Sequence, residues 1–236
     1  VFVLILFFGK AYITPVFKSL PTTVLALLSF IASLAFGFHV LMHLPSIDFR
    51  AYKIGDNLLT NMSTPENAPK AIQEFTWVFN VNGEQQTVVT NGSYPEVNGN
   101  YVSVETKVVK EGYQPSILDF SIESETEDLT SNFLAKEKLV MVVSYSLETA
   151  ETKGLEALKL FSKEAKSKGY TVIGLSASGG DAKDAVKSSY GLDFEFYLCD
   201  EKALKTVVRS NPGVLILSRG TVEQKAHWND INNLDL

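Results

Sequence analysis

The 236-residue chain contains a single cysteine, Cys199, and few basic residues. One cysteine cannot form a disulfide within the chain, and it excludes metal-binding knuckles built from several cysteines. The 21 lysines and arginines are outnumbered by 27 acidic residues, which gives a net charge of −6. Without a basic stripe to neutralise phosphates, nucleic acid is excluded as the main partner.

Charge is missing altogether from residues 22–44, which contain no Asp, Glu, Lys or Arg. A helix over this stretch would be about 34 Å long, enough to cross the hydrocarbon of a bilayer. The sequence therefore predicts a transmembrane helix in contact with membrane lipid. Ser29, Ser33 and Gly37 recur every four residues, which indicates a face that packs against other transmembrane helices.

The membrane part is predicted to cover residues 1–44. The chain opens on the apolar residues 1–8 without a methionine, so we expect a fragment that starts inside an earlier transmembrane helix. A secretory signal is the alternative, although no basic segment precedes the apolar run. Lys10 and Lys18 lie in the loop that follows, and the positive-inside rule places this loop in the cytoplasm. Everything after Leu44 is then expected on the other side of the membrane.

His39 and His43 are four residues apart and therefore share one face at the end of this helix. Polar groups at membrane depth are often functional, so these residues are candidate ligands of a haem, a metal or a quinone. The alternative is that both anchor the helix near the lipid headgroups. No third ligand is visible nearby, and no metal site is predicted.

Residues 45–112 are predicted to form a linker followed by a small β unit. Phe75, Trp77 and Phe79 alternate with smaller or polar residues, which is typical of a strand with one buried face. Asn82-Gly83 then gives a strong hairpin signal, and residues 85–90 return as the partner strand. Residues 101–109 alternate again and complete a unit of about three strands.

Residues 113–236 are predicted to form an α/β domain. Apolar runs typical of buried strands alternate with helical periodicity in the order βαβαβαββ. The last two strands read as an antiparallel hairpin after a parallel series. The expected strands cover residues 139–145, 170–177, 194–199, 214–218 and 221–228, and the expected helices cover residues 151–168, 181–190 and 201–209.

This order of elements, with Tyr113-Gln114-Pro115 and Asp119-Phe120 before it, resembles the thioredoxin superfamily. Pro212 falls where that family places a cis proline beside its active site, and an ordinary trans turn is the alternative. The resemblance implies a binding site at Asn211-Pro212-Gly213, where an extended segment of a partner protein pairs with the main chain.

The chain departs from the thioredoxin pattern at the residues that carry its chemistry. The family's dithiol chemistry needs Cys-x-x-Cys at the start of the first helix, but residues 146–153 contain no cysteine. Glu148 and Glu151 would also disfavour a thiolate there. Cys199 is the remaining catalytic candidate, but Asp200 beside it would raise its pKa, and most such cysteines are buried and inert.

A second resemblance covers essentially the whole chain. The runs HLPSIDFRAYKIG at residues 43–55 and FGKAYI at residues 8–13 are similar to a Bacteroidota family of DoxX-like (MauE/DoxX, redox-associated) membrane proteins. In that family a four-helix membrane unit precedes a thioredoxin-like domain, which implies a bacterial inner membrane with the soluble domain in the periplasm. Two hypotheses follow: a non-enzymatic module that binds an extracytoplasmic partner protein, or a redox subunit that acts through a quinone in the membrane helices.

Overall fold

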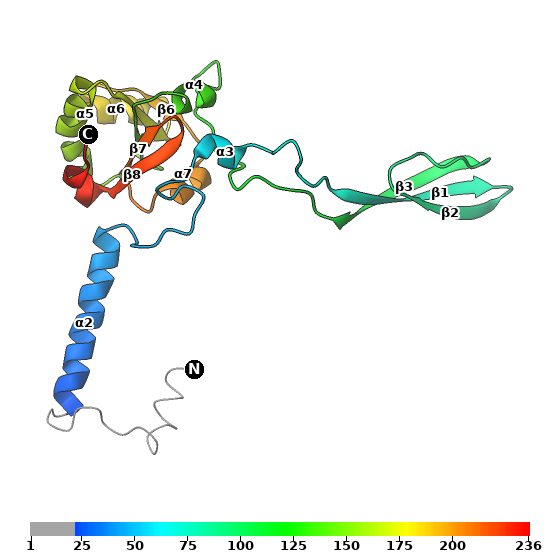
Figure 1. Ribbon diagram of the computed structural model, residues 1–236, viewed down its shortest axis with the longest axis horizontal. Coiled ribbons are helices and arrows are strands. Elements are labelled where there is room, and N and C mark those ends of the chain that lie inside the picture. The colour runs from blue at the N-terminus through cyan, green and yellow to red at the C-terminus, as the bar shows by residue number, and fades with distance from the viewer. Residues whose placement is uncertain (1–21) are drawn as a thin grey trace. The chain divides into compact units, whose positions relative to one another are not determined.

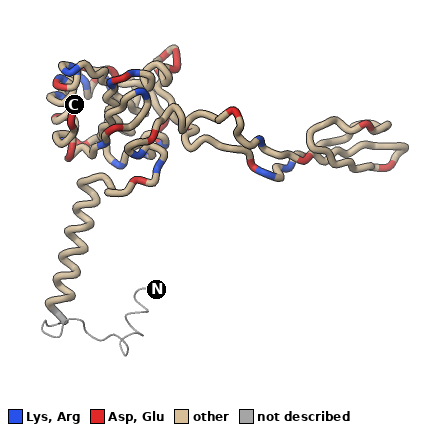
Figure 2. Tube along the Cα trace, in the orientation of Figure 1, with Lys and Arg blue, Asp and Glu red and all other residues tan. Residues whose placement is uncertain are grey.

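The computed structural model describes residues 22–236, so the predicted cytoplasmic loop with Lys10 and Lys18 lies outside the described residues. Helix α2 (Thr22–Met42) covers the stretch without charged residues and ends two residues before Leu44. Figure 2 shows the whole helix without a single charged residue. By length and composition, Val24–Met42 is long and apolar enough to cross a membrane, with a mean hydropathy of 2.2. Its phenylalanines and all of its leucines except Leu25 are more than half exposed.

The chain divides into two compact units, residues 1–46 and residues 47–236. The second unit contains a five-stranded sheet and, as a separate element, a three-stranded sheet (Figure 1). The predicted domain boundary between residues 112 and 113, which would separate the small β unit from the α/β domain, stays a prediction.

The five-stranded sheet has the order β6-β5-β4-β7-β8. Strands β4, β5 and β6 are parallel, whereas β7 runs antiparallel to β4 and forms a hairpin with β8. This is the thioredoxin-like topology expected from the sequence. The strands are β4 (Leu139–Val143), β5 (Thr171–Ser176), β6 (Phe196–Leu198), β7 (Gly213–Ser218) and β8 (Thr221–His227).

Helices cover this sheet, which explains why its central strands are continuous apolar runs. All five residues of β4 are buried. Val140 and Val142 pack in one cluster with Leu158 and Phe161 of helix α5 (Thr152–Ser167). Met141 is buried on the opposite face of the sheet. The helices are α4 (Thr130–Leu134), α5 (Thr152–Ser167), α6 (Gly180–Tyr190), α7 (Glu201–Val207) and the 3-10 helix η2 (Trp228–Asn233).

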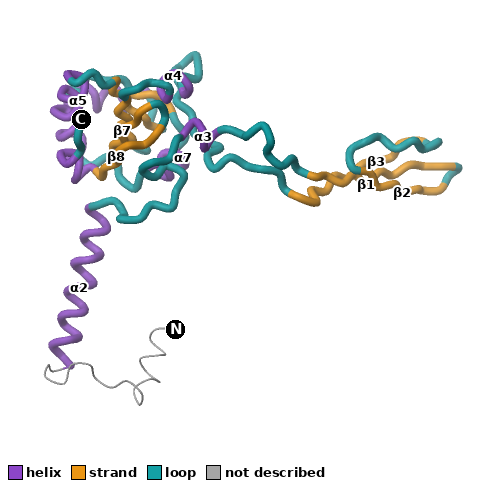
Figure 3. Tube along the Cα trace, in the orientation of Figure 1, coloured by secondary structure: helices purple, strands orange, loops and turns teal. Residues whose placement is uncertain are grey.

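The chain from residue 47 to residue 62 packs against this α/β part, although the sequence suggested a linker. Gly55 N and Leu58 N donate to the carbonyls of Val222 and Gly220, both at 2.8 Å. Tyr52 and Leu58 are buried, and Leu58 begins the short helix α3 (Leu58–Met62). In Figure 3, residues 111–129, which carry the expected start of the thioredoxin-like domain, are almost entirely loop.

The three-stranded sheet has the order β2-β1-β3 and is antiparallel throughout. Its hairpin turns at Asn82 and Gly83, both with positive φ, as the Asn-Gly signal predicted. Phe75, Trp77 and Phe79 alternate along the central strand. Phe75 stacks on Trp77, and Trp77 and Phe79 meet Tyr94 and Tyr101, with Trp77 and Tyr94 ring centroids 5.0 Å apart. The strands are β1 (Ile72–Val81), β2 (Glu84–Thr90) and β3 (Asn100–Lys110).

Candidate binding site at the start of helix α5

The predicted turn before β7 lies beside the first residues of α5. The peptide bond between Asn211 and Pro212 is cis, which confirms the prediction. Pro212 packs closely against Gly154 in the first turn of the helix. A Cβ at Gly154 would lie 2.9 Å from Pro212 Cγ and 2.7 Å from Trp228 Cβ, so only glycine allows the helix and the proline to approach this closely.

Asn211 ties the turn to the loop between β4 and α5. Its side-chain amide donates to Ser146 O at 2.7 Å, and its Oδ1 accepts from Ser144 Oγ at 2.6 Å. Its main-chain carbonyl accepts from Glu151 N at 2.8 Å. These bonds fix the backbone of Asn211 next to the start of α5, where the free N–H groups of the first turn gather.

Two threonines stand at this helix start with the spacing of the missing dithiol. Thr152 is the first residue of α5, and Thr149 lies three residues before it in the loop. Thr149 Oγ1 accepts a hydrogen bond from Asn211 Nδ2 at 3.3 Å. A threonine hydroxyl can hydrogen-bond a partner, but it cannot exchange disulfides. Two hydroxyl groups and no thiol therefore lie at this helix start, next to the cis proline.

Glu148 adds a negative charge to the same loop. Its carboxylate accepts from Ser178 Oγ at 2.7 Å and from Ser146 Oγ at 2.9 Å. The hydrogen bond from Ser178 is the main reason that the pKa of Glu148 lies below its usual value. The carboxylate thus stays ionised at neutral pH, as the sequence argument against a thiolate at this position requires.

A pocket of about 480 Å³ opens beside the turn. Tyr145 and Trp228 give it aromatic walls, and Lys205 lies with Nζ 5.0 Å from the centre of the Tyr145 ring. Arg209 and Glu151 add one charge of each sign. Aromatic walls with charged groups around them are typical of sites that accept a side chain of another protein.

Cys199, the catalytic candidate, does not belong to this site. It lies at the end of β6, is almost fully buried, and burial raises the pKa of its thiol to about 11. The adjacent Asp200 raises the pKa further, as expected from the sequence. A buried thiol with a raised pKa is a poor nucleophile, so the geometry favours the interpretation of Cys199 as an inert core residue.

The rings of His39 and His43 lie next to each other, as their spacing predicted, with ring centroids 4.5 Å apart and ring planes tilted by 33°. His39 lies in the last turn of the helix, and His43 lies just past its end at Met42. Among residues 22–236, no group of three or more His, Cys, Asp or Glu side chains is arranged to hold a metal ion.

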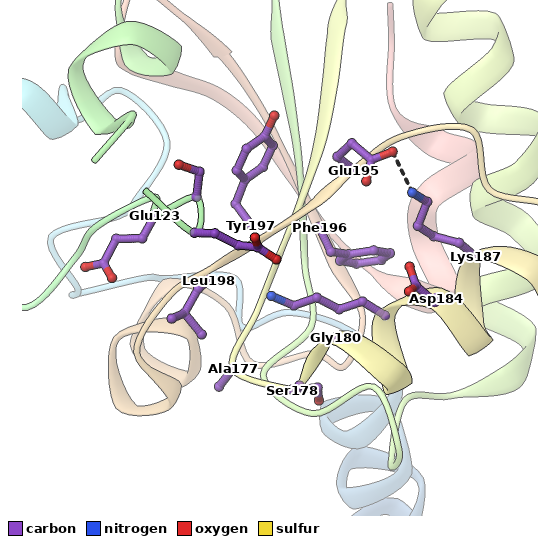
Figure 4. Close-up of a pocket in the computed structure, with 14 residues that line it drawn as sticks. Glu123, Ala177, Ser178, Gly180, Asp184, Lys187, Glu195, Phe196, Tyr197 and Leu198 are labelled. Atoms are coloured by element: carbon purple, nitrogen blue, oxygen red, sulfur yellow. Dashed lines mark hydrogen bonds and ion pairs between the residues drawn. The ribbon is translucent and has the colours of Figure 1, made fainter. Parts of the chain in front are cut away.

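A second pocket, of about 520 Å³, lies where β6 and the loop after β5 meet the start of α6 (Figure 4). Its charged side chains are of both signs, and Lys187 pairs with Glu195 at 2.5 Å. Partial burial lowers the pKa of Lys183 in the same pocket. Two lysines and four carboxylates line this pocket, so its wall carries charges of both signs with carboxylates in excess.

Sequence analysis missed the parts of the site that come from distant segments. The hydrogen bonds from Ser144 to Asn211 and from Ser178 to Glu148 join residues that are 30 or more positions apart. No local sequence pattern predicts such bonds. The Thr149-x-x-Thr152 spacing was present in the sequence. It could have been recognised by placing the cysteine positions of the resembled family on the start of the predicted helix.

No family model matches the chain, and no protein with a curated annotation matches it. Similar solved structures include the bacterioferritin comigratory protein of Xanthomonas campestris, 17% identical over 46% of this chain and 78% of that chain, with a TM-score of 0.33. Reduced Prx3 of Vibrio vulnificus with hydrogen peroxide is 10% identical over 45% and 80% of the two chains, with a TM-score of 0.37. The thioredoxin domain of a thiol-disulfide oxidoreductase from Bacteroides vulgatus is 13% identical over 45% and 81%, with a TM-score of 0.36. Likeness at these levels assigns no activity to this chain.

Proposed function

We propose that this chain is a membrane-anchored, thioredoxin-like binding module that receives a segment of a partner protein at the start of α5. The observation that carries the proposal is the pair Thr149 and Thr152 beside the Asn211-Pro212 bond. The site keeps a fixed main chain and an adjoining pocket, while the only thiol, Cys199, is buried elsewhere. Such a site can bind but cannot perform dithiol exchange.

The binding mode is main-chain pairing with an extended segment, in which a partner strand adds to an exposed backbone edge. Because the Asn211 carbonyl already accepts from Glu151 N, the partner strand pairs with the Asn211 N–H. One side chain of the partner enters the pocket between Tyr145 and Trp228, where Arg209 favours an acidic or hydrogen-bonding group.

The location proposed for this module is the periplasmic face of a bacterial inner membrane, as an accessory part of a DoxX-like protein. The length and composition of α2 support the anchor, and the two lysines of the preceding loop support the orientation. Protease added to spheroplasts should digest the domain after residue 46. Complete protection of that domain would contradict the orientation.

Site-specific photocrosslinking in the native bacterium tests the binding site. A benzoylphenylalanine in place of Thr149 should give a discrete crosslinked product, while the same group in place of Glu156 on the exposed side of α5 should not. Arg209→Glu should reduce the yield at position 149 several-fold. Equal products from both positions would contradict a site at this turn.

Disulfide exchange provides the complementary test. The purified chain should reduce insulin no faster than buffer, and Cys199→Ser should not alter this background. Turnover that disappears in Cys199→Ser would instead make the lone cysteine a catalytic residue.

The adjacent rings of His39 and His43 favour a second candidate function, a redox subunit that acts through a quinone at the membrane. Solvent extraction of the detergent-purified protein should then yield stoichiometric quinone, and His39→Ala should abolish its retention. A preparation without quinone or haem absorbance would leave the binding module as the function.

A further inference from the structure

Residues 48–50 are held rigidly against the α/β part by a buried ion pair. Asp48 accepts from Arg50 Nε at 2.7 Å and from Lys225 Nζ at 2.8 Å. Lys225 belongs to β8 and its side chain is only 3% exposed. Arg50 Nη1 also donates to the carbonyl of Thr206 in α7 at 2.9 Å. These contacts fix the backbone of this segment to two elements of the fold.

The fixed segment holds two large apolar side chains in solvent. Ile47 is 68% exposed and Phe49 is 91% exposed. The phenylalanines of the surrounding α/β part behave differently, since Phe133 is partly buried and the others, Phe120, Phe161, Phe194 and Phe196, are buried. Leaving a phenylalanine in water forgoes the free energy that its burial would contribute. A flexible loop could turn Phe49 inward, but the contacts of Asp48 and Arg50 on either side prevent this.

The position of Phe49 in the chain points to lipid as the medium that covers it. It follows the last residue of α2, Met42, by seven residues, which at full extension span about 25 Å. The headgroup region is about 5–8 Å thick on each side of the hydrocarbon. The headgroup–acyl boundary therefore lies within the reach of Phe49. Lys53 lies four residues further on and forms a loose ion pair with Asp56, with Nζ 3.9 Å from Oδ1. Its side chain is still 53% exposed, so it remains accessible to anionic headgroups. An apolar pair beside a basic residue is typical of interfacial contacts with a bilayer.

We propose that Ile47 and Phe49 form a membrane foot, in which both side chains insert at the headgroup–acyl boundary of the bilayer that α2 crosses. The foot rests on the membrane anchoring in the proposed function and adds a second, independent lipid contact. Because the segment is fixed to β8 and α7, the foot orients the thioredoxin-like part on the membrane surface.

Quenching by brominated lipids tests the foot in the full chain. The protein is reconstituted in phosphatidylcholine–phosphatidylglycerol vesicles, and membrane attachment is checked by flotation. Phe49→Trp is compared with Leu160→Trp, at a position on α5 that is 75% exposed, and with the wild type, whose Trp77 and Trp228 set the background. Brominated lipid should quench the added emission of Phe49→Trp at least twofold more than that of Leu160→Trp.

Each other outcome overturns the foot in a different way. Flotation with equal quenching at both positions overturns the foot but leaves the anchor intact. A blue-shifted Phe49→Trp emission that brominated lipid does not quench places the side chain against protein, and also overturns it. Failure to float overturns the anchoring and the foot together.

Discussion

The two sheets of this protein bury their strands to opposite degrees. Every residue of β4 is buried, whereas every residue of β3 is exposed. Both strands are rich in valine, and Val142 is fully buried while Val109 is 57% exposed. Helices cover both faces of the five-stranded sheet, but the three-stranded sheet has only one aromatic cluster, on one face. The same residue type therefore stabilises one sheet through burial and does little for the other.

The two tryptophans allow each sheet to be followed separately. Trp77 lies in the aromatic cluster of the small sheet, and Trp228 packs against the core of the large one. In a Trp228→Phe background the remaining tryptophan, Trp77, reports on the small sheet. In a Trp77→Phe background Trp228 reports on the large sheet. In the predictions below, unfolding is measured by urea titration of tryptophan emission in detergent.

Phe79→Ala should have the largest effect, confined to the small sheet. Phe79 is fully buried in that sheet, and removing such a side chain costs about 3–5 kcal/mol. A three-stranded sheet has little else to stabilise it, so Trp77 emission should shift to the red before urea is added. The Trp228 midpoint should not move. A shift of both signals would show that the two sheets unfold as one unit.

Leu158→Ala should destabilise the large sheet by about 2–5 kcal/mol, because Leu158 is fully buried between α5 and β4. The Trp228 midpoint should fall accordingly, and Trp77 emission in folded protein should stay unchanged. Leu160→Ala, two residues along the same helix at an exposed position, serves as the control and should cost less than about 0.5 kcal/mol.

Asp48→Asn should destabilise the large sheet by about 3 kcal/mol, because Lys225 would keep a buried charge without its counter-ion. The small sheet contains no comparable ion pair among the described residues. Glu156→Gln on the exposed side of α5 is the matched control. A loss equal to that of the control would show that the pair contributes no net stability.

The same pair predicts a pH dependence. Burial alone would raise the pKa of Asp48, but the hydrogen bonds from Arg50 and Lys225 outweigh it and hold the pKa far below its usual value. The stability that ionised Asp48 contributes is thus fully present above the unfolded-state pKa of an aspartate, about 3.9. It is lost progressively as pH falls below this value towards the lower pKa of the folded state. The gap in urea midpoint between wild type and Asp48→Asn should be constant from pH 7 to 5 and should narrow below pH 4.

Matched valine-to-threonine changes should show the smallest effects. They compare the burial of the two sheets most directly, because the same substitution is made in each. Val142→Thr buries a hydroxyl in the large sheet and should cost about 1–3 kcal/mol. Val109→Thr on the small sheet should change stability by less than about 0.5 kcal/mol. Equal costs would mean that β3 is covered in the folded protein.

The sequence predicted the elements of the α/β part to within a few residues, because buried strands and amphipathic helices leave a periodic pattern. The Asn82-Gly83 hairpin and the cis bond before Pro212 were also confirmed. The packing of Tyr52 and Leu58 was missed because their partners are distant in the sequence. The ring centroid of Tyr52 lies 5.9 Å from that of Phe120, and Leu58 N donates to the carbonyl of Gly220 in the turn before β8. The short helices α3 and α4 have five residues each, too few to show a helical period.

The candidate site was likewise predicted where its residues are neighbours in the sequence and missed where they are distant. Asn211-Pro212-Gly213 was predicted through a resemblance, and the absence of cysteine was visible in the residues themselves. The pocket walls were not predictable, because Tyr145, Lys205 and Trp228 come from three segments that only the folded sheet brings together.

The small sheet also leaves both of its outer strands unpaired within the described chain, and such strands invite association with other chains. Two features of β3 oppose this. Its pairing with β1 shifts register twice, near Ile72 and near Val78, so the strand is bent by bulges. Glu105, Lys107 and Lys110 place charges along it. A flat foreign strand that docked there would meet both the bends and the charges, so pairing of another chain along β3 is disfavoured.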